Sequence, residues 1–332
     1  MGERRGRDLV SVIEAAYAVD LPERAWLQGI IDAMRPFVED GLGMAAYVYD
    51  TADRPFRLRS FIVDGCPIDG AGLAMLQDGA HDDFVRRSWI GRAAMTASET
   101  PGYATHPGVI EVFHPAGIRD VMVVNALDAI GVGCWIGAPL RALRRLQGAE
   151  RERWNRIAAH VRAGLRMRLR LSGAAASAAA ALACPPEAVF TTDGDPVHVE
   201  EPAMQARGAL RTAVLRMERA RGELRDDPDR ALPSWTALVR ARWTLVDSFE
   251  ADRRQYIVAR ANPIGARPLA RLSERERQVV ACLSMGHTNK ETAYELGLSH
   301  STVRVLVARA RAKLGVTTLP ELVAIYRRDT LT

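Results

Sequence analysis

Lysine is almost absent from this chain. Of its 45 basic residues only Lys290 and Lys313 are lysines, and both lie in the last seventy positions. A phosphoacceptor receiver domain needs a lysine at a strand end beside clustered acidic residues, so the region before residue 290 cannot supply that mechanism. Arginine, with its planar fork of donors, is the cation everywhere else.

Cysteine and long apolar runs are also scarce. The four cysteines, Cys66, Cys134, Cys184 and Cys282, are isolated in the sequence, so they fit neither a metal knuckle nor a secreted disulfide scaffold. No apolar run approaches the roughly twenty residues needed to cross a bilayer. The N-terminal sequence MGERRGRDLV is charged and lacks a following apolar signal core. We therefore expect reduced thiols, a cytoplasmic location and no membrane partner.

Motifs for catalysis and metal binding are missing too. The sequence contains no phosphate-cradling GxxxxGK and no serine elbow GxSxG, so we predict that the protein is not an enzyme. The histidines at His81, His106 and His114 have spacings that match no recognised metal site. We predict no metal and no cofactor, and leave any small-molecule effector unidentified.

What the sequence does contain is a regular series of helix starts near the C-terminus. A hydroxyl residue followed three positions later by glutamate is typical of a capping box, in which each side chain satisfies a backbone donor. Ser299 is a candidate cap for a further helix, and Gly297 can take the left-handed backbone of a sharp turn before it. The three capping-box pairs are Ser273 with Glu276, Thr288 with Glu291, and Thr318 with Glu321.

Apolar residues recur at helical spacing through this region, which predicts a helical core with the third helix facing outward. The segment resembles the GerE/LuxR-type helix-turn-helix at the C-terminus of many bacterial transcription regulators. The resemblance covers about sixty residues and rests on Leu272–Glu276, Asn289–Glu291, Ala293, Leu296–Ser299, Ser301–Arg304 and Lys313–Val316. It implies that a helix of about residues 300–314 enters the major groove and that a fourth helix supplies a dimer contact.

The resemblance and side-chain chemistry together predict DNA-contacting residues. Arginine can donate two hydrogen bonds to guanine, and small apolar side chains can contact a thymine methyl group. Hydroxyls and lysines can bind phosphate, a contact that does not depend on the base sequence. The predicted base-reading residues are Arg304, Val305, Ala308 and Arg309, and the predicted backbone contacts are Thr302, Lys290, Arg311, Lys313, Thr288 and Asn289.

Two of these assignments have structural alternatives. Thr302 can serve only as a first-turn hydrogen-bonding residue, and Lys313 can simply complement the dipole at a helix C-terminus. The sequence also departs from the family pattern at Leu306, where histidine is common, and at Ala310, where a bulky aliphatic residue is common.

Charge is concentrated in the same segment. Residues 264–332 contain eleven arginines and lysines against six acidic residues, which accounts for the whole formal net charge of +5. A local basic surface on a neutral body is typical of a module that neutralises phosphate.

Composition shifts predict the domain boundaries. We expect a GAF-like sensor domain at 1–172, an alanine-rich linker at 173–186, a short PAS-like connector at 187–262 and a LuxR-type helix-turn-helix domain at 268–332. The expected fold class is multidomain α+β, with antiparallel-sheet sensor domains flanked by helices and an all-α C-terminal domain of four helices. The predicted strands are 44–49, 56–63, 121–127, 132–138, 188–192, 196–200, 243–249 and 255–259, and the predicted helices before the C-terminal domain include 70–88 and 147–171.

Two features of the N-terminal region bear on signalling. The arginine-rich helix at 147–171 is interpreted as a solvated cationic face over an apolar face, with a dimerising or signal-carrying helix as the alternative. Core packing is the preferred explanation of the aromatic residues, with a ligand pocket as the alternative, and both can hold for some of them. The candidate ligand-binding residues are Tyr47, Phe61, Trp89, Asn125 and Trp135.

The sequence therefore predicts a one-component, sequence-specific transcription regulator that binds double-stranded DNA as a homodimer. An unknown ligand or protein at the N-terminal domain would control it. The alternative is a protein-interaction module whose helix-turn-helix contacts another protein, such as RNA polymerase, rather than DNA.

Overall fold

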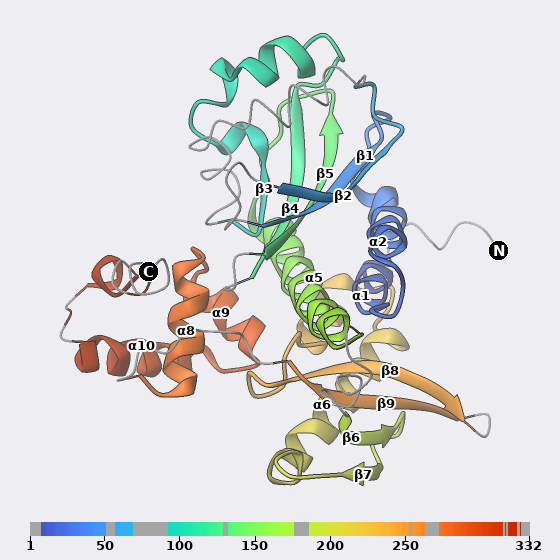
Figure 1. Cartoon of the computed structure of the whole chain (residues 1–332), viewed down its shortest axis with the longest axis vertical. Helices are drawn as coiled ribbons and strands as arrows, with labels where there is room; N and C mark the ends of the chain where they lie inside the picture. The colour runs from blue at the N-terminus through green and yellow to red at the C-terminus, as the bar shows by residue number, and fades with distance from the viewer. Residues whose placement is uncertain are drawn as a thin grey trace. The chain divides into compact units, whose positions relative to one another are not determined.

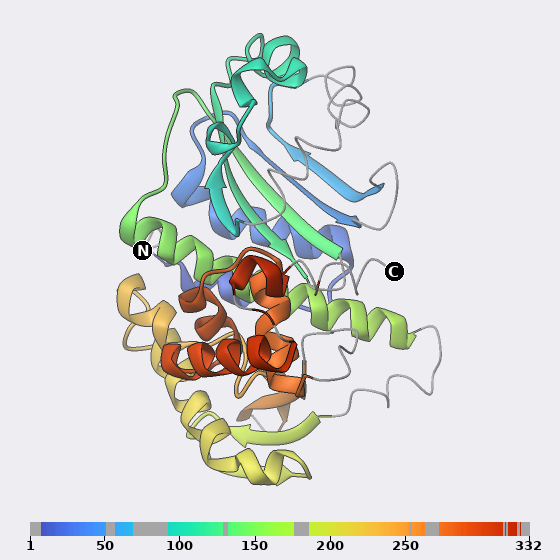
Figure 2. The same ribbon diagram turned by 90° about the vertical axis from the view of Figure 1, so that its left-hand side faces the viewer.

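The computed structural model describes residues 8–50, 57–68, 92–128, 132–175, 186–251, 254–262, 272–314, 316, 318–323 and 326. The chain forms two compact units, Met1–Arg162 and Ala163–Thr332 (Figures 1 and 2). The boundary lies within one long helix, α5 (Gly148–Ala175), so each unit contains a part of it.

The first unit is built on a five-stranded antiparallel sheet (Figure 1). Its strand order is β2 (Arg57–Asp64), β1 (Met44–Asp50), β5 (Val132–Leu140), β4 (Asp120–Leu127) and β3 (Ala94–Thr96). The two predicted strand pairs are confirmed, whereas the three-residue β3 was not predicted because it is too short to show an alternating pattern. The helix predicted at 70–88 lies outside the described residues.

Helices α1 (Val10–Ala16), α2 (Glu23–Val38) and the first part of α5 pack together in this unit. The hydroxyl of Tyr17, the residue that ends α1, lies 2.7 Å from Nδ1 of His160 in α5. The rings of Phe37 in α2 and Trp154 in α5 meet edge to face. Short helical turns at Ala97–Glu99 (η2), Tyr103–Thr105 (η3) and Val109–Phe113 (η4) lead from β3 to β4.

The arginines of α5 correct one expectation from the sequence. Arg162, Arg166 and Arg168 are each at least 94% buried, so this helix does not present a simple solvated cationic face. Arg162 Nε donates to the carbonyl oxygen of Leu127, and Arg166 donates to Oε1 of Glu295. Buried guanidiniums persist where backbone carbonyls and carboxylates supply their hydrogen bonds, which helical periodicity cannot reveal.

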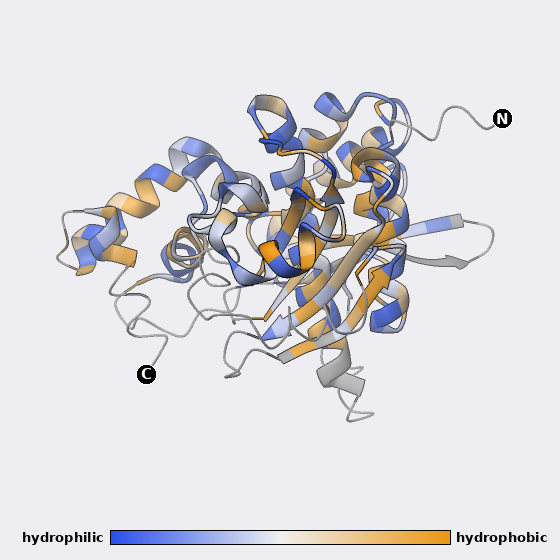
Figure 3. Cartoon of the chain, turned by 90° about the horizontal axis from the view of Figure 1, so that it is seen from above, coloured by the Kyte–Doolittle hydropathy of each residue, from blue (hydrophilic) through white to orange (hydrophobic). Residues whose placement is uncertain are grey.

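The second unit begins with a four-stranded antiparallel sheet in the order β7 (Pro196–Val199), β6 (Pro186–Thr191), β9 (Arg254–Ala261) and β8 (Trp243–Ala251). Three helical segments connect β7 to β8: η6 (Ala203–Ala206), α6 (Arg207–Arg221) and α7 (Pro228–Ser234). Phe190, Leu210, Val214, Trp235 and Ile257 form part of the buried core. Hydrophobic residues gather on the strands of the molecule (Figure 3).

The C-terminal part of this unit is helical, which confirms the predicted fold class. Its helices are α8 (Glu274–Ser284), α9 (Asn289–Leu296) and α10 (His300–Leu314), and residues 319–323 are also helical. All three predicted capping boxes form their reciprocal hydrogen bonds. Among the described residues, no helix combines the length and hydrophobicity needed to span a bilayer.

Candidate nucleic-acid interface

The turn before α10 fixes the direction of that helix. Gly297 ends α9 in the left-handed conformation, with φ of 61°, and the amide of Leu298 donates to the carbonyl of Ala293 at 2.9 Å. The Ser299 hydroxyl then accepts from the amide of Thr302 at 3.0 Å and caps α10, as predicted. Only three residues, Gly297–Ser299, therefore separate α9 from α10.

Helix α10 has one buried and one exposed face. Val303, Val307 and Ala310 face the core and are at least 91% buried. The four residues predicted to read bases are all exposed: Arg304, Val305, Ala308 and Arg309. Val305, a β-branched apolar residue, is 48% exposed in the middle of this face.

The predicted backbone contacts fall into two groups. Thr288, Lys290 and Thr302 are exposed near the starts of α9 and α10, where the positive end of the helix dipole favours an anion. Asn289 and Arg311 are only partly exposed, and each has a buried polar atom without a hydrogen-bond partner among the described residues. The Thr302 hydroxyl also lies 2.8 Å from the Ser299 hydroxyl, so it takes part in the cap.

Lys313 has a partner that the sequence did not indicate. Its Nζ lies 2.7 Å from Oε2 of Glu276, the buried carboxylate of the first capping box. Burial alone would raise the pKa of Glu276, but hydrogen bonds from Lys313 and Ser273 outweigh it and hold that pKa below its ordinary value. The lysine therefore joins the end of α10 to the start of α8, and a phosphate contact at Lys313 stays a prediction.

The side of the helical domain formed by α9 packs against α7 and the residues that follow it. The Tyr294 hydroxyl lies 2.8 Å from the carbonyl oxygens of Leu232 and Trp235, and the amide of Ala241 donates to the carbonyl of Leu296 at 2.7 Å. These contacts hold the helical domain by the end of α9 and leave the four residues of the α10 face exposed within the second unit.

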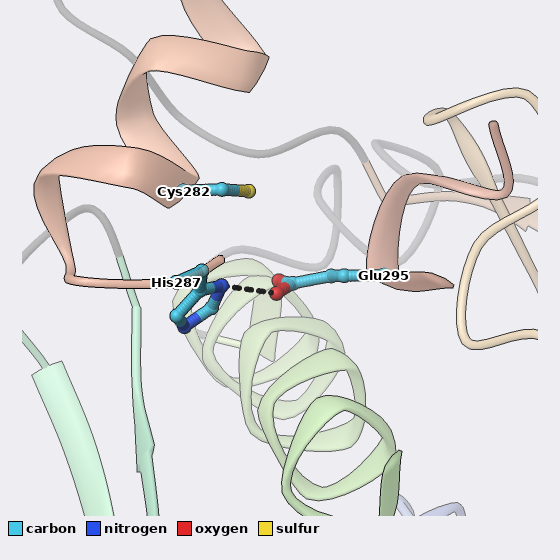
Figure 4. A group of neighbouring side chains, drawn as sticks. All are labelled: Cys282, His287 and Glu295. Carbon is cyan, nitrogen blue, oxygen red and sulfur yellow. Dashed lines mark ion pairs between the residues drawn. The ribbon is translucent and has the colours of Figure 1, made fainter. Parts of the chain in front are cut away.

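A buried polar cluster lies at the same end of α9. Arg166 of α5 donates to Oε1 of Glu295 at 3.2 Å, and His287 Nδ1 lies 3.2 Å from Oε2 of the same carboxylate. Cys282 completes a group of three possible metal ligands with His287 and Glu295 (Figure 4). This cluster could not be predicted from the sequence, because the spacing of its residues follows no metal motif and Arg166 is 129 residues from Glu295.

Four of the five candidate ligand residues lie together on the first sheet. Strand register places Trp135 opposite both Tyr47 and Asn125, and the rings of Tyr47 and Trp135 stack with centroids 4.9 Å apart. The Phe61 ring lies 5.6 Å from that of Tyr47. Asn125, Trp135, Tyr47 and Phe61 thus form a row across β4, β5, β1 and β2. Trp89 lies outside the described residues.

Tyr49 extends this row, although it was not among the candidate ligand residues. Its hydroxyl donates to Oδ1 of the buried Asn125 at 2.8 Å, and burial raises the pKa of the phenol well above its ordinary value. A Cβ at Gly133 would lie 2.2 Å from the Tyr49 ring, so glycine is required there. Alternation along β1 is the signal that could have found Tyr49, since it shares a face with Tyr47.

Comparisons with known proteins concern the C-terminal segment. The family model "Bacterial regulatory proteins, luxR family" matches residues 270–326. The transcriptional regulatory protein FixJ of Azorhizobium caulinodans is 51% identical over 55 residues, which is 17% of this chain and 26% of FixJ. The HTH-type transcriptional activator RamA of Corynebacterium glutamicum is 39% identical over 66 residues, 20% of this chain and 24% of RamA.

The chain therefore spans only about a quarter of the length of these relatives. A solved structure described as SdiA in complex with octanoyl-rac-glycerol covers 98% of this chain and 91% of its own, at 12% identity and a TM-score of 0.23. A likeness of that size carries no argument about fold or ligand. The capped helices, the matched family model and the local identity agree for one segment: residues 270–326 form a helix-turn-helix domain of the luxR family of bacterial regulatory proteins.

Proposed function

We propose that this protein is a sequence-specific transcription regulator that binds double-stranded DNA through α10. The observation that supports it best is the exposed face of α10, which carries two arginines and two small apolar residues in a luxR-family domain. In the major groove, Arg304 and Arg309 would donate to guanine, and Val305 and Ala308 would contact thymine methyl groups.

Phosphate contacts would orient the domain on the duplex. Lys290, Thr288 and Thr302 lie at helix starts and are exposed, so they are better placed for this role than the partly exposed Asn289 and Arg311. Residues 264–332 carry a net charge of +5, which would attract the DNA phosphates whatever the base sequence. We propose a homodimer on symmetric half-sites, with the helix at 319–323 as the dimer contact.

Control by the N-terminal region forms the second half of the proposal. The row of Asn125, Trp135, Tyr47 and Phe61 offers stacking surfaces and an amide to an aromatic or amphipathic effector. A GAF-like sensor at 1–172, a PAS-like connector at 187–262 and a linker between them remain our proposed division. Helix α5 is the proposed route of coupling, because it belongs to both compact units and carries Arg166.

Selection of binding sites from random duplexes tests the DNA-binding proposal. Wild-type protein should enrich a symmetric sequence. Arg304→Ala should lose about 1–3 kcal/mol of discrimination at one base position per half-site, because one bidentate contact disappears. Lys290→Ala should weaken binding to all sequences alike and reduce the salt dependence by about one counterion.

Arg216→Ala is the matched control for the loss of an arginine. This exposed residue lies on α6, away from the helix-turn-helix domain, and its replacement should leave both affinity and preference unchanged. Equal binding to every duplex, or the same effect of Arg304→Ala and Lys290→Ala on all sequences, would contradict the proposal. Retained binding to RNA polymerase without DNA selectivity would instead favour a protein-interaction module.

A further inference from the structure

Cys282, His287 and Glu295 bring three kinds of metal-binding atom together inside the helix-turn-helix domain. Cys282 lies near the end of α8, His287 in the turn that follows, and Glu295 in the last turn of α9. Their ligand atoms all lie within 4.8 Å of one another, and all three residues are buried (Figure 4). We propose that these residues form a binding site for one Zn²⁺ ion.

The donor set suits zinc better than other common ions. Thiolate, imidazole and carboxylate are the three side-chain ligands that Zn²⁺ uses, whereas Mg²⁺ and Ca²⁺ take oxygen alone. In a tetrahedral site with metal–ligand bonds of about 2.0–2.3 Å, neighbouring donors are roughly 3.3–3.8 Å apart. The distance of 3.2 Å between His287 Nδ1 and Glu295 Oε2 is already close to this range, and the full group needs a contraction of about 1 Å.

One nitrogen of the cluster, Nδ1 of His287, lacks a hydrogen bond within the described part of the chain, and a bound cation would give it a partner. Nδ1 of His287 is buried and has no hydrogen-bond partner among the described residues, although Glu295 Oε2 is 3.2 Å away. Buried polar atoms in this condition are uncommon in native proteins. A metal ion at this point accepts a lone pair from the imidazole nitrogen, so it supplies a partner to an atom that lies near a carboxylate but makes no hydrogen bond to any described residue.

Arg166 fits a role in the outer shell of the site. It donates to Oε1 of Glu295, so Oε2 remains directed at His287 and the proposed ion. Ligand carboxylates in zinc sites are held in this way by outer hydrogen bonds. Thiolate and carboxylate balance the two charges of Zn²⁺. Binding displaces the proton from the Cys282 thiol, and the guanidinium of Arg166 stays beside the site as one net positive charge.

The ion has a route to the buried site through the turn between α8 and α9. Gly286 and Thr288, on either side of His287, are both exposed, and Gly286 has φ of 89°. His287 is thus one residue from solvent in both directions along the chain. A small local opening of this turn admits a hydrated ion without unfolding α8 or α9.

Metal titration of the full chain, stripped of metal with a chelator, tests the proposal. Zn²⁺ added against a chromophoric competitor should bind at one ion per chain with high affinity. Co²⁺ should give the ligand-field spectrum of a tetrahedral site together with a thiolate-to-cobalt charge-transfer band. Cys282→Ala should lose the band and weaken Zn²⁺ binding by more than about 100-fold, since a direct ligand matters at least as much as an outer one.

Cys66→Ala is the matched control, because burial raises the pKa of the Cys66 thiol to about 11 and it lies in the other compact unit. This variant should keep both the band and the affinity. His287→Gln retains the thiol and should also weaken binding, which covers the case in which Cys282→Ala misfolds as judged by circular dichroism. No binding by the wild-type chain, or unchanged binding by both ligand variants, would overturn the proposal.

Discussion

Lys313 ties together two ends of the helix-turn-helix domain. Its ammonium group meets Glu276, which is 97% buried in its side chain and also accepts the amide of Ser273 at 2.7 Å. One carboxylate therefore serves the cap of α8 and the last turn of α10 at once. At the level of single residues, this contact gives Lys313 a structural role whether or not it also meets phosphate.

Lys313→Ala should lower the free energy of unfolding of the helical domain by about 1 kcal/mol at pH 7, because a charged hydrogen bond to a buried carboxylate is lost while the lysine itself is partly screened by water. The pKa of Glu276 in the folded protein lies below its ordinary value of 4.5. The contribution of the Glu276 carboxylate to stability is therefore fully present above pH 4.5. It is lost as the pH falls through the pKa of Glu276 in the folded protein.

Urea denaturation of the wild-type and Lys313→Ala chains at pH 7 and at decreasing pH measures this difference. The two stabilities should converge in acid, where Glu276 is protonated in both folded and unfolded states. Arg304→Ala, an exposed change on the same helix, should alter stability by less than about 0.5 kcal/mol at either pH. A difference between the wild-type and Lys313→Ala chains that is independent of pH would refute the role given to the Glu276 carboxylate.

Local residue patterns explain why some of these contacts could be predicted. A capping box depends on residues three positions apart, so Ser273 with Glu276 and Thr288 with Glu291 are visible in the sequence. Lys313 lies 37 residues from Glu276, and only the packing of α8 against α10 brings them together. The sequence therefore predicts helix starts and the exposed face of α10, but not the contacts between helices.

At the scale of elements, the end of α9 combines a helix stop with a packing contact. Gly297 adopts positive φ, and a Cβ added there would lie 2.1 Å from the carbonyl oxygen of Leu238. The first property is predictable from a glycine after an apolar helix, because such a glycine often takes the left-handed conformation. The second depends on the segment after α7, which no pattern in the helix-turn-helix region indicates.

Gly297→Ala should therefore destabilise the second unit by clearly more than the roughly 1 kcal/mol expected for a left-handed alanine alone. Gly102→Ala is a suitable control, since Gly102 has φ of 89° and nothing within 4 Å of an added Cβ. Thermal unfolding of both variants compares the two costs. Equal losses would mean that the backbone of residue 238 moves away readily and that this contact contributes little.

In the first sheet, too, contacts within a hairpin can be predicted from the sequence, whereas contacts between strands far apart in the chain cannot. Alternation along β1 and β5 places Tyr47 and Trp135 on one face, and the hairpin signals predicted β1–β2 and β4–β5 as antiparallel pairs. The pairing of β1 with β5 joins residues about ninety positions apart, and it alone makes Tyr47 the neighbour of Trp135. Ring stacking at that point could not be read from either strand by itself.

Across the whole molecule, α5 is the element that most changes the interpretation drawn from the sequence. Arg166 reaches Glu295 of the helix-turn-helix domain and the carbonyl of Asn262 at the end of β9, while Asn262 donates to Ala163 at 2.9 Å. Three parts of the second unit therefore meet at one buried guanidinium. Buried ion pairs often contribute little net stability but make the loss of a single partner costly.

A double-mutant cycle tests whether this pair attaches α9 to α5. In the metal-free chain, Arg166→Met should lower the free energy of opening of α9 by about 3–5 kcal/mol, because Glu295 loses its guanidinium partner while its side chain is 99% buried. Glu295→Gln alone leaves the buried guanidinium of Arg166 without the carboxylate that balances its charge. The double variant Arg166→Met, Glu295→Gln should cost less than the two single changes together, with a coupling of more than about 1 kcal/mol.

Hydrogen exchange at the amides of α9 reports this local free energy directly, because exchange there requires the helix to open. The exposed pair Arg277–Glu274 in α8, with the same charges at 2.6 Å, serves as the control cycle and should show a coupling below about 1 kcal/mol. If the buried pair gave a coupling no larger than this surface pair, other contacts, such as those of Tyr294 with residues 232 and 235, would have to hold α9 in place. The proposed route from α5 to the helix-turn-helix domain would then have to pass through α7 and the segment after it instead.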